Sequence, residues 1–226
     1  MALYKVLKSF NEKGLVAGVD EAGRGPVIGP MVIAIVGTDN EAKTNESFYL
    51  YGIKDSKMLS PIKRALLHEK ILEENFYVSI AMLYPIDIDE GMEIMSLNDL
   101  ELVTMAQLIK ENNNVKKVYV DSCDVNEDRF KTNLLKKIGN GVEIISKHKA
   151  DQIYPLVSAA SIIAKVERDY AIEDIKKATK IDFGSGYPSD PKTINAINNN
   201  FDILLPYIRK KWKTVNRKVV KNIDEF

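Results

Sequence analysis

The sequence predicts an α/β protein in which a mixed β-sheet is flanked by helices and followed by a small helical extension at the carboxyl terminus. Short apolar runs rich in β-branched residues alternate with longer segments whose apolar residues recur every three or four positions. The first runs follow one another closely, which favours antiparallel strands. The later runs alternate with helical segments, which favours parallel strands, so the sheet is expected to be mixed.

Three strands are expected at the front of the chain, where they would form an antiparallel meander. Apolar runs at residues 15–20 and 30–37 predict the first two strands, and an aromatic run at 48–53 predicts the third. We interpret residues 1–14 as a polar lead-in and residues 38–47 as a polar loop.

Helices and strands alternate in the second part of the chain. The expected helices span residues 61–75, 97–111, 127–138 and 151–179, and the expected strands span 76–83, 117–121 and 142–145. Ser60, Ser96 and Asn126 belong to the residue types that cap the start of a helix, and Gly139 to the type that ends one. Asp190, which precedes a proline, is expected to cap a further helix.

Length and composition narrow the class of protein. A chain of 226 residues can bury a core without disulfides, and its one cysteine, Cys123, cannot form an intrachain disulfide. A reducing, cytoplasmic setting therefore fits, and the amino terminus lacks an apolar segment long enough for a signal peptide. No apolar run is long enough for a membrane span, and we expect a monomer. The chain has 32 basic and 32 acidic residues, so its net charge neither favours nor disfavours a polyanionic partner.

Carboxylates stand at the ends of two predicted strands. Asp20 and Glu21 directly follow an apolar run, and Asp121 ends a later one. If these strands are parallel neighbours, their acids emerge at the same edge of the sheet, where sites in open α/β sheets lie. Asp151 starts the last long helix, although the helix dipole alone explains an acid there equally well.

Several acids in one place need a counter-charge, and oxygen ligands suit Mg²⁺ or Mn²⁺. Two such ions, roughly 3.5–4 Å apart, can stabilise the attacking and leaving oxygens when a phosphodiester bond is cut. Zinc is disfavoured because the chain has only His68 and His148 and lacks a Cys/His spacing pattern. A P-loop string is absent, and a serine or cysteine nucleophile lacks a partner histidine signature.

Six short sequence blocks occur in order along the chain. They lie at residues 20–26 (Asp-Glu-Ala-Gly-Arg-Gly-Pro), 54–57, 119–121, 149–151, 158–165 and 184–190. Together they resemble the motifs of type 2 ribonuclease H (ribonuclease HII), and the resemblance covers about residues 15–210. The compact length, with Asp-Ser-Cys-Asp at 121–124, looks most like the archaeal single-subunit branch.

The resemblance implies a fold and an activity. The fold is ribonuclease H-like, with a catalytic domain over residues 1–180 and a helical, substrate-binding extension and tail over residues 181–226. The implied activity is metal-dependent endonucleolytic cleavage of the RNA strand of RNA–DNA hybrids, including cuts 5′ of single ribonucleotides embedded in duplex DNA. Two divalent ions, Mg²⁺ or Mn²⁺, would act in the reactive complex, and the products would carry 3′-hydroxyl and 5′-phosphate ends.

The resemblance also implies site residues. The expected catalytic and metal-binding acids are Asp20, Glu21, Asp121 and Asp151. The residues expected to bind substrate are Gly23, Arg24, Gly25, Lys54, Ser56, Lys57, Lys165 and Tyr187. The first three match the motif that contacts the ribose 2′-hydroxyl, largely through backbone groups. Tyr187 matches the tyrosine that engages the same hydroxyl and stacks on the following deoxyribose. The lysines are candidate phosphate contacts, although solvated surface lysines explain them nearly as well.

The tail carries a basic run and a partial docking motif. The basic residues between 206 and 221 are Arg209, Lys210, Lys211, Lys213, Arg217, Lys218 and Lys221. We interpret the run as a contact with duplex phosphates in preference to a solvated helix face. Ile223 and Phe226 are spaced as in the short motif that docks on the DNA sliding clamp. The glutamine and the second aromatic of that motif are missing, so a frayed terminus is the default.

Two other functions remain open at this point. One is a DNA-cleaving member of the same superfamily, against which the Gly-Arg-Gly loop argues. The other is a non-catalytic protein that binds RNA–DNA hybrids through the basic tail. Metal-dependent cleavage of a duplex with one embedded ribonucleotide separates both from the ribonuclease.

Overall fold

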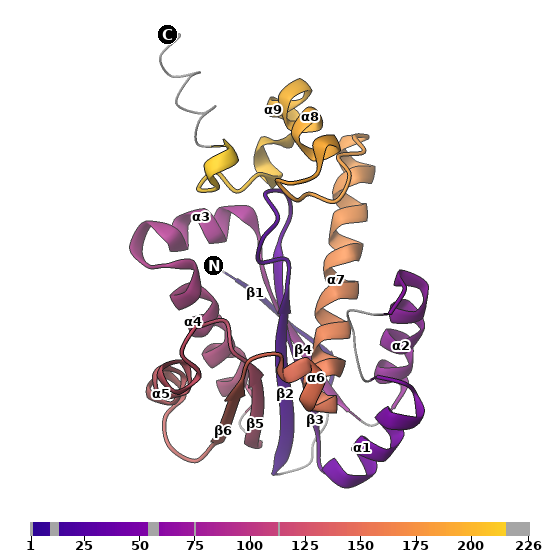
Figure 1. The fold of residues 1–226 in the computed structure, drawn as a ribbon, viewed down its shortest axis with the longest axis vertical. Coiled ribbons are helices and arrows are strands. Elements are labelled where there is room, and N and C mark those ends of the chain that lie inside the picture. The colour runs from indigo at the N-terminus through magenta and orange to yellow at the C-terminus, as the bar shows by residue number, and fades with distance from the viewer. Residues whose placement is uncertain (1, 10–13, 54–58, 75, 113, 216–226) are drawn as a thin grey trace.

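The computed structural model describes residues 2–9, 14–53, 59–74, 76–112 and 114–215. These residues form a mixed β-sheet of six strands. The strands are β1 (Leu3–Lys8), β2 (Leu15–Ala22), β3 (Met31–Thr38), β4 (Tyr77–Leu83), β5 (Val115–Asp121) and β6 (Glu143–Lys147). Their order across the sheet is β1-β4-β3-β2-β5-β6 (Figure 1). The predicted α/β class is confirmed.

Helices cover both faces of this sheet. The helices are α1 (Glu41–Leu50), α2 (Pro61–Glu73), α3 (Pro85–Ile94), α4 (Leu97–Lys110), α5 (Glu127–Ile138), α6 (Ala150–Ile153), α7 (Pro155–Thr179), α8 (Pro191–Asn199) and α9 (Phe201–Leu204), with a 3-10 turn η1 (Leu205–Tyr207). The core on one face is built with α3, α4 and α5, and the core on the other with α1, α2 and α7 (Figure 1). None of the described helices is both long enough and apolar enough to cross a membrane.

The strand pairing is mixed, as predicted. The pairs β1–β4, β4–β3 and β3–β2 are antiparallel. The pairs β2–β5 and β5–β6 are parallel, and their connections run through helices. The strand that ends in the Asp20–Glu21 pair is therefore a parallel neighbour of the strand that ends at Asp121, which confirms the arrangement that the acids required.

Helix starts are the local feature that the sequence predicted best. Ser60, Ser96 and Asn126 each accept a hydrogen bond from the backbone N–H three residues on, at the starts of α2, α4 and α5. Gly139, with φ of 95°, ends α5. These signals depend on neighbours in the sequence, so they need no knowledge of the fold.

The prediction of a strand at residues 48–53 is wrong, and so is that of a loop at 38–47, because residues 41–50 form α1. Asn40 accepts a hydrogen bond from the N–H of Lys43 at 3.0 Å, which caps the helix. Thr44 and Phe48 are buried, and they lie four residues apart on one helical face. The third strand of the meander is β4, which begins at Tyr77, 27 residues after the end of α1.

Two elements were missed, and one helix is interrupted. The lead-in contains β1, an edge strand whose Leu3 and Val6 remain more than half exposed, so its sequence lacks a continuous apolar run. Helix α3 was not predicted. The long helix expected over 151–179 is split into α6 and α7 at Tyr154, because Pro155 cannot donate to a preceding carbonyl and starts a new helix.

Helix α7 crosses β2 at backbone contact distance. A Cβ atom built on Gly18 would lie 2.2 Å from the carbonyl carbon of Leu156 and 2.4 Å from the nitrogen of Val157. The helix can therefore lie this close to the strand only because residue 18 has no side chain. The contact determines how far α6 and the first turns of α7 stand from the end of β2.

Gly18→Ala is expected to lower the free energy of unfolding by about 2 kcal/mol, because overpacking a tight core costs ~1–3 kcal/mol. Gly37→Ala in the neighbouring strand β3 is the matched control, since a Cβ atom there meets nothing closer than 3.6 Å. The control should be neutral or slightly stabilising. Urea unfolding of both variants measures the difference, and equal losses would contradict the packing argument.

Candidate active site

The ends of β2 and β5 bring Asp20 and Asp121 to the same edge of the sheet. Val19 lies opposite Val120 in the parallel pair, and the two aspartates are the next residues along each strand. Asp20 is 4% exposed, and Glu21 beside it is half-buried. The N–H of Glu21 donates to Oδ1 of Asp20 at 2.8 Å. Carboxylates from two strands therefore meet at this edge.

The start of α6 is attached to the end of β5. The N–H of Ala150 donates to Oδ1 of Asp121 at 2.9 Å. Asp151 is the next residue along α6 and is 1% exposed. The turn that leads into α6 has Lys149 in the left-handed region, with φ of 54°. The hydrogen bond to Asp121 thus holds the backbone that carries Asp151 against the acidic edge.

The carboxylates at this edge repel one another. Burial, and then the charge of Glu21, raise the pKa of Asp20 well above its usual value. Burial, and then the charge of Glu101, raise the pKa of Glu21 to about 7. The charge of Asp121 raises both of these pKa values further. Like charges are therefore buried close together, which is unfavourable without a cation.

Helix α7 supplies groups that oppose this repulsion. A hydrogen bond with Ser161 lowers the pKa of Asp20. Nζ of Lys165 in turn donates to Oγ of Ser161 at 2.7 Å. Lys165 was expected to contact substrate phosphates, and it does line the cleft beside the acids. Its hydrogen bond to Ser161 also connects it to Asp20.

Glu101 on α4 is a buried acid that the sequence analysis missed. Its side chain is fully buried and forms an ion pair with Nη1 of Arg24. Burial raises the pKa of Glu101, and the guanidinium of Arg24 opposes that rise. A signal was present, because Glu101 lies four residues from both Leu97 and Met105 on the apolar stripe of the predicted helix. An acid on such a stripe needs a buried partner.

The glycine-rich loop after β2 is held by the carboxyl-terminal segment. The side chain of Arg209 donates to the carbonyls of Gly23 at 2.6 Å, Arg24 at 3.1 Å and Gly29 at 3.0 Å. The indole Nε1 of Trp212 donates to the carbonyl of Gly25 at 3.0 Å. The carbonyls of this loop are therefore directed toward the carboxyl-terminal segment.

The prediction that Arg209 contacts duplex phosphates is wrong. Arg209 is fully buried, and its guanidinium is hydrogen-bonded to backbone carbonyls. Lys210 is exposed, whereas Lys211 pairs with Glu93 on α3. Lys213 is exposed as well, and the remaining residues of the predicted basic run and clamp motif, Arg217, Lys218, Lys221, Ile223 and Phe226, lie outside the described residues.

Tyr187 lies beside the glycine-rich loop. Its side chain is 42% exposed, which agrees with the expected exposed position. A Cβ atom on Gly25 would lie 3.3 Å from Cε1 of the Tyr187 ring. The N–H of Val27 donates to the carbonyl of Gly186 at 2.8 Å, which joins the two loops. Residues 23–25 and Tyr187, expected to act on the same sugar, therefore lie together.

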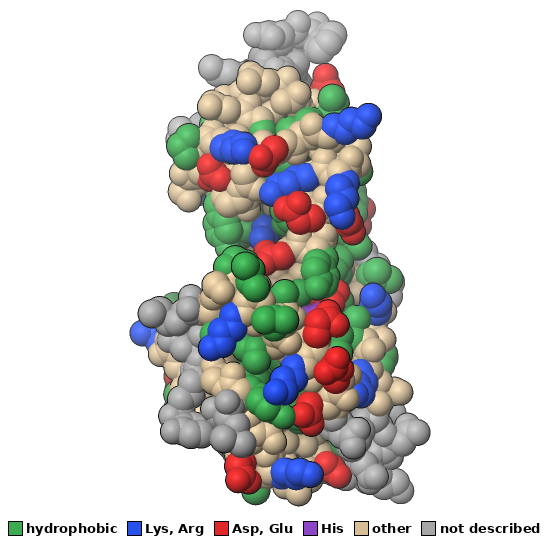
Figure 2. Space-filling model, turned by 90° about the vertical axis from the view of Figure 1, so that its right-hand side faces the viewer, with side chains coloured by type: hydrophobic (Ala, Val, Ile, Leu, Met, Phe, Trp, Pro, Cys, Tyr) green, Lys and Arg blue, Asp and Glu red, His purple; other side chains and the backbone are tan. Residues whose placement is uncertain are grey.

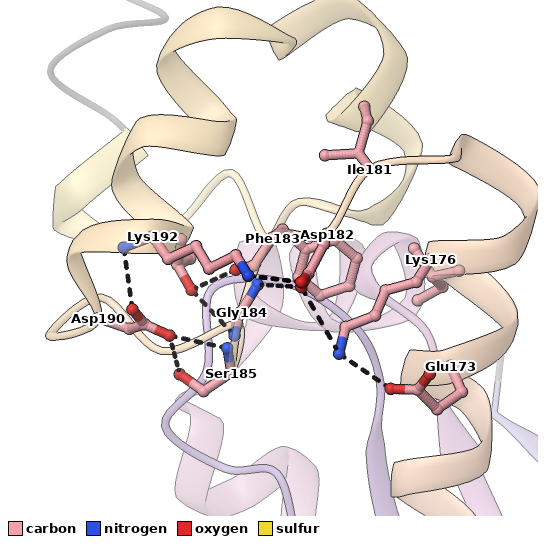
Figure 3. Close-up of polar contacts among 12 residues, drawn as sticks. Glu173, Lys176, Ile181, Asp182, Phe183, Gly184, Ser185, Asp190 and Lys192 are labelled. Atoms are coloured by element: carbon pink, nitrogen blue, oxygen red, sulfur yellow. Dashed lines mark hydrogen bonds and ion pairs between the residues drawn. The ribbon is translucent and has the colours of Figure 1, made fainter.

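The Tyr187 loop is braced by α7 and α8 (Figure 3). Asp190, as predicted, caps α8 by accepting from the N–H of Lys192 at 2.9 Å. Its other oxygen accepts from the N–H and the hydroxyl of Ser185, at 2.8 and 2.7 Å. Asp182 pairs with Lys192 and, at 3.9 Å, with Lys176 of α7. These contacts fix the backbone on both sides of Gly184.

Arg168 of α7 is a second residue that the sequence analysis missed. It is 7% exposed, and among the described residues its Nε and Nη2 have no hydrogen-bond partner. A Cβ atom on Gly23 would lie 2.5 Å from its Cδ and Nε, and one on Gly186 would lie 3.7 Å from Nη2. The guanidinium is also 5.8 Å from the centre of the Tyr187 ring. Arg168 thus fills the space between the two loops.

A cleft of about 780 Å³ brings most of these groups together. Its lining includes Glu21, Gly23, Arg24, Gly25, Arg64, Lys165, Arg168, Lys176 and Tyr187. The candidates Lys54, Ser56 and Lys57 lie outside the described residues. On the side of the molecule formed by α7 and α2, basic and acidic side chains lie next to one another (Figure 2). The lining of the cleft likewise combines its cations with the acids Glu21, Asp169 and Glu173.

The donor set of the acidic edge fits a hard divalent cation. Its groups are carboxylate oxygens, which Mg²⁺ and Mn²⁺ prefer. Among the described residues, Oε2 of Glu21 is buried without a hydrogen-bond partner. A cation there would also offset the repulsion that raises the pKa values of Asp20 and Glu21. In the described chain, however, no three His, Cys, Asp or Glu side chains already converge closely enough to hold an ion.

Comparison with known proteins identifies close relatives. A family model described as Ribonuclease HII matches residues 17–215. A ribonuclease HII from Caldivirga maquilingensis is 47% identical over 205 residues, which cover 90% of this chain and 94% of the relative. The crystal structure of ribonuclease H2 from Pyrococcus horikoshii OT3 is similar with a TM-score of 0.82 and 39% identity, over 94% of this chain and 100% of the other. The structure of the PCNA:RNase HII complex from Archaeoglobus fulgidus is similar with a TM-score of 0.79 and 38% identity, over 88% of this chain and 95% of the other.

Stability without metal is expected to fall as the pH rises from about 5 to about 7. The pKa of Glu21 is about 7 in the folded protein and 4.5 ordinarily. Between these values the folded state keeps a proton that the unfolded state has released, so the stabilisation present below pH 4.5 is lost as the pH rises through 7. The loss should not exceed about 3 kcal/mol.

Urea unfolding in a chelator between pH 5 and 8 measures this slope. Glu21→Gln should flatten it, because the glutamine does not titrate. Glu143→Gln, on the exposed part of β6, is the control and should leave it unchanged. Parallel curves for the wild type and Glu21→Gln would contradict the assignment.

Proposed function

This chain belongs to the ribonuclease HII family, whose members are metal-dependent ribonucleases H, and we propose that it cuts RNA–DNA hybrids and also duplex DNA 5′ of a single embedded ribonucleotide. The observation that carries the proposal is that three features lie next to one another. Acids stand at the ends of two parallel strands. One of these acids, Glu21, lines the same cleft as the glycine-rich loop and the exposed Tyr187, which lies against that loop. The products would carry 3′-hydroxyl and 5′-phosphate ends.

We assign the acids the role of holding two divalent ions, Mg²⁺ or Mn²⁺. The proposed ligands are Asp20, Glu21, Asp121 and Asp151. When bound, the ions would supply positive charge to the attacking and leaving oxygens of the phosphodiester. Ser161 and Lys165 hold Asp20 from the side of α7, so that this carboxylate is oriented before substrate arrives.

The loop at residues 23–25 is proposed to contact the ribose 2′-hydroxyl through its backbone. The 2′-hydroxyl is the group by which a protein distinguishes RNA from DNA at one nucleotide. The carbonyls of Gly23, Arg24 and Gly25 accept hydrogen bonds from Arg209 and Trp212. The N–H groups are therefore the backbone groups that we assign to the sugar. The ring of Tyr187 would stack on the deoxyribose that follows the ribonucleotide.

Cations in the cleft are proposed to contact the phosphates. Lys165 is connected to Asp20 through Ser161, and Arg64 and Lys176 line the same cleft. Lys54, Ser56 and Lys57 keep the same proposed role. Such contacts fix the register of a duplex without selecting its sequence, which suits an enzyme that must act on any ribonucleotide.

Family membership favours cleavage over the alternative of non-catalytic hybrid binding. The DNA-cleaving alternative is disfavoured because it has no use for a loop and a tyrosine arranged around one sugar. We propose residues 1–180 as the catalytic domain, since the acids lie there. Residues 181–226 would be the substrate-binding extension, because they contribute Tyr187.

A sliding clamp is a proposed partner. A relative with a similar fold forms a complex with PCNA. In this chain the proposed contact is the carboxyl-terminal pair Ile223 and Phe226. Such docking would keep the enzyme on newly made DNA, where RNA primers and misincorporated ribonucleotides occur.

Asp121→Asn is expected to lower the rate of cleavage at least about a hundredfold, because a neutral amide cannot help to hold the cations. Binding of an RNA–DNA hybrid should remain, since the cations of the cleft are unchanged. Asp128→Asn, on the exposed surface of α5, is the control and should cleave like the wild type. Rates at saturating Mg²⁺ or Mn²⁺ decide the point. Substantial cleavage by Asp121→Asn would refute the role given to this acid.

Tyr187→Ala is expected to slow cleavage of a DNA duplex with one ribonucleotide by about tenfold or more, because stacking on an aromatic ring contributes about 1–3 kcal/mol. Tyr187→Phe keeps the ring and separates stacking from the hydroxyl group. The measurement compares this duplex with a long RNA–DNA hybrid, for which we expect a smaller loss. If Tyr187→Ala cleaves the single-ribonucleotide duplex like the wild type, the stacking role is wrong.

A further inference from the structure

The side chain of Arg24 is held by helix α4. Its Nη1 pairs with Oε2 of Glu101, and its Nη2 donates to Oδ1 of Asn98. Asn98 and Glu101 are three residues apart, so both acceptors lie on the same face of α4. The guanidinium in the centre of the Gly-Arg-Gly loop is therefore anchored to the protein by both ends of its fork.

Burial makes this anchor difficult to replace. The side chain of Glu101 is 0% exposed, whereas that of Arg24 is 33% exposed. A buried carboxylate needs a paired and hydrogen-bonded cation, so losing Arg24 would leave the fully buried Glu101 without its counter-charge. A lysine would not substitute, because a single ammonium group cannot contact the two acceptors as the planar guanidinium does.

The opposite side of the same loop is held by a different part of the chain. Arg209 donates to the carbonyls of Gly23 and Arg24, and Trp212 donates to that of Gly25. Gly23 has φ of 86°, a region in which glycine has unusual freedom. A loop with two glycines would sample many conformations unless contacts of this kind restrained it. Helix α4 restrains the side chain, and the carboxyl-terminal segment restrains the backbone.

We propose that Glu101 and Asn98 are positioning residues for ribose recognition, and that they act through Arg24. They hold the guanidinium so that the N–H groups of residues 23–25 keep one arrangement toward the sugar. Glu101 does so without contacting substrate. This inference rests on the proposed function, because it specifies how the loop assigned to the 2′-hydroxyl keeps its geometry.

The proposal has a kinetic consequence. Phosphate contacts elsewhere in the cleft bind the duplex, so a displaced loop should lower kcat more than it raises KM. A displacement of about 1 Å in a positioning element can lower a rate by a hundredfold. A residue that merely stabilises the fold would leave kcat unchanged when the variant is fully folded at the assay temperature.

The first test uses Asn98, which is half-buried and tolerates change more easily than Glu101. Asn98→Ala should lower kcat about tenfold on a duplex with one ribonucleotide and change KM less than about threefold. Asn98→Asp keeps an acceptor for Nη2 and should restore kcat to within about threefold of the wild type. Glu111→Gln, on the exposed end of α4, is the control and should match the wild type.

The second test is a double-mutant cycle with Arg24→Ala and Glu101→Gln. If Glu101 acts through Arg24, adding Glu101→Gln to Arg24→Ala should lower kcat by less than about twofold further. Each single variant should lower kcat about tenfold or more. Thermal unfolding confirms that each variant is folded at the assay temperature. If Glu101→Gln does not fold, the Asn98 series decides the proposal.

Two outcomes would overturn the proposal. A further tenfold loss on adding Glu101→Gln to Arg24→Ala would mean that Glu101 acts independently of the arginine, as a metal ligand would. Wild-type kcat in folded Asn98→Ala would mean that the anchor does not position the loop. A wild-type protein that does not cleave the single-ribonucleotide duplex would instead refute the proposed function, so the two failures are distinguishable.

Discussion

Helix α7 can lie against β2 only because residue 18 is a glycine, and the geometry of the site follows from that contact. A Cβ atom built there would lie only 2.2 Å from the carbonyl carbon of Leu156, so any side chain at this position would force the helix away from the strand. The same helix carries Ser161, which hydrogen-bonds to Asp20, and Arg168, which fills the space between the two loops. A packing constraint two residues before Asp20 thus influences where the polar groups of α7 lie.

Electrostatic repulsion opposes this packing. Asp20, Glu21 and Asp121 are brought together at one edge, where burial and mutual charge raise the pKa values of the first two. Buried like charges destabilise a fold, so their retention is explained better by a ligand than by stability. Carboxylate oxygens are good ligands for hard divalent cations. The unfavourable repulsion among these acids is therefore consistent with metal-dependent hydrolysis at this edge.

Several features that depend on neighbours in the sequence were predictable, although α1 and α3 were not, and the partners of buried charged residues were not. The caps at Ser60, Ser96 and Asn126 and the strand ends at Asp20 and Asp121 could be identified because capping, alternation and parallel pairing are local or general rules. The partners of the buried Glu101 and Arg209 could not be identified, even though the place of Glu101 on an apolar stripe indicated its burial. Their partners lie 77 and about 180 residues away, and an isolated acid or arginine looks like a surface residue.

The glycine-rich loop explains why these distant contacts matter. A short loop with glycines can bring backbone donors close to a sugar, but its freedom would make the contact imprecise. Residues distant in the sequence restrain this loop. Glu101 and Asn98 of α4 hydrogen-bond the guanidinium of Arg24, and Arg209 of the carboxyl-terminal segment hydrogen-bonds its carbonyl. In the function that we propose, selection of one hydroxyl group on a nucleotide would therefore depend on long-range contacts that no single motif contains. Residues outside the six sequence blocks, such as Glu101 and Arg209, would then take part in recognition.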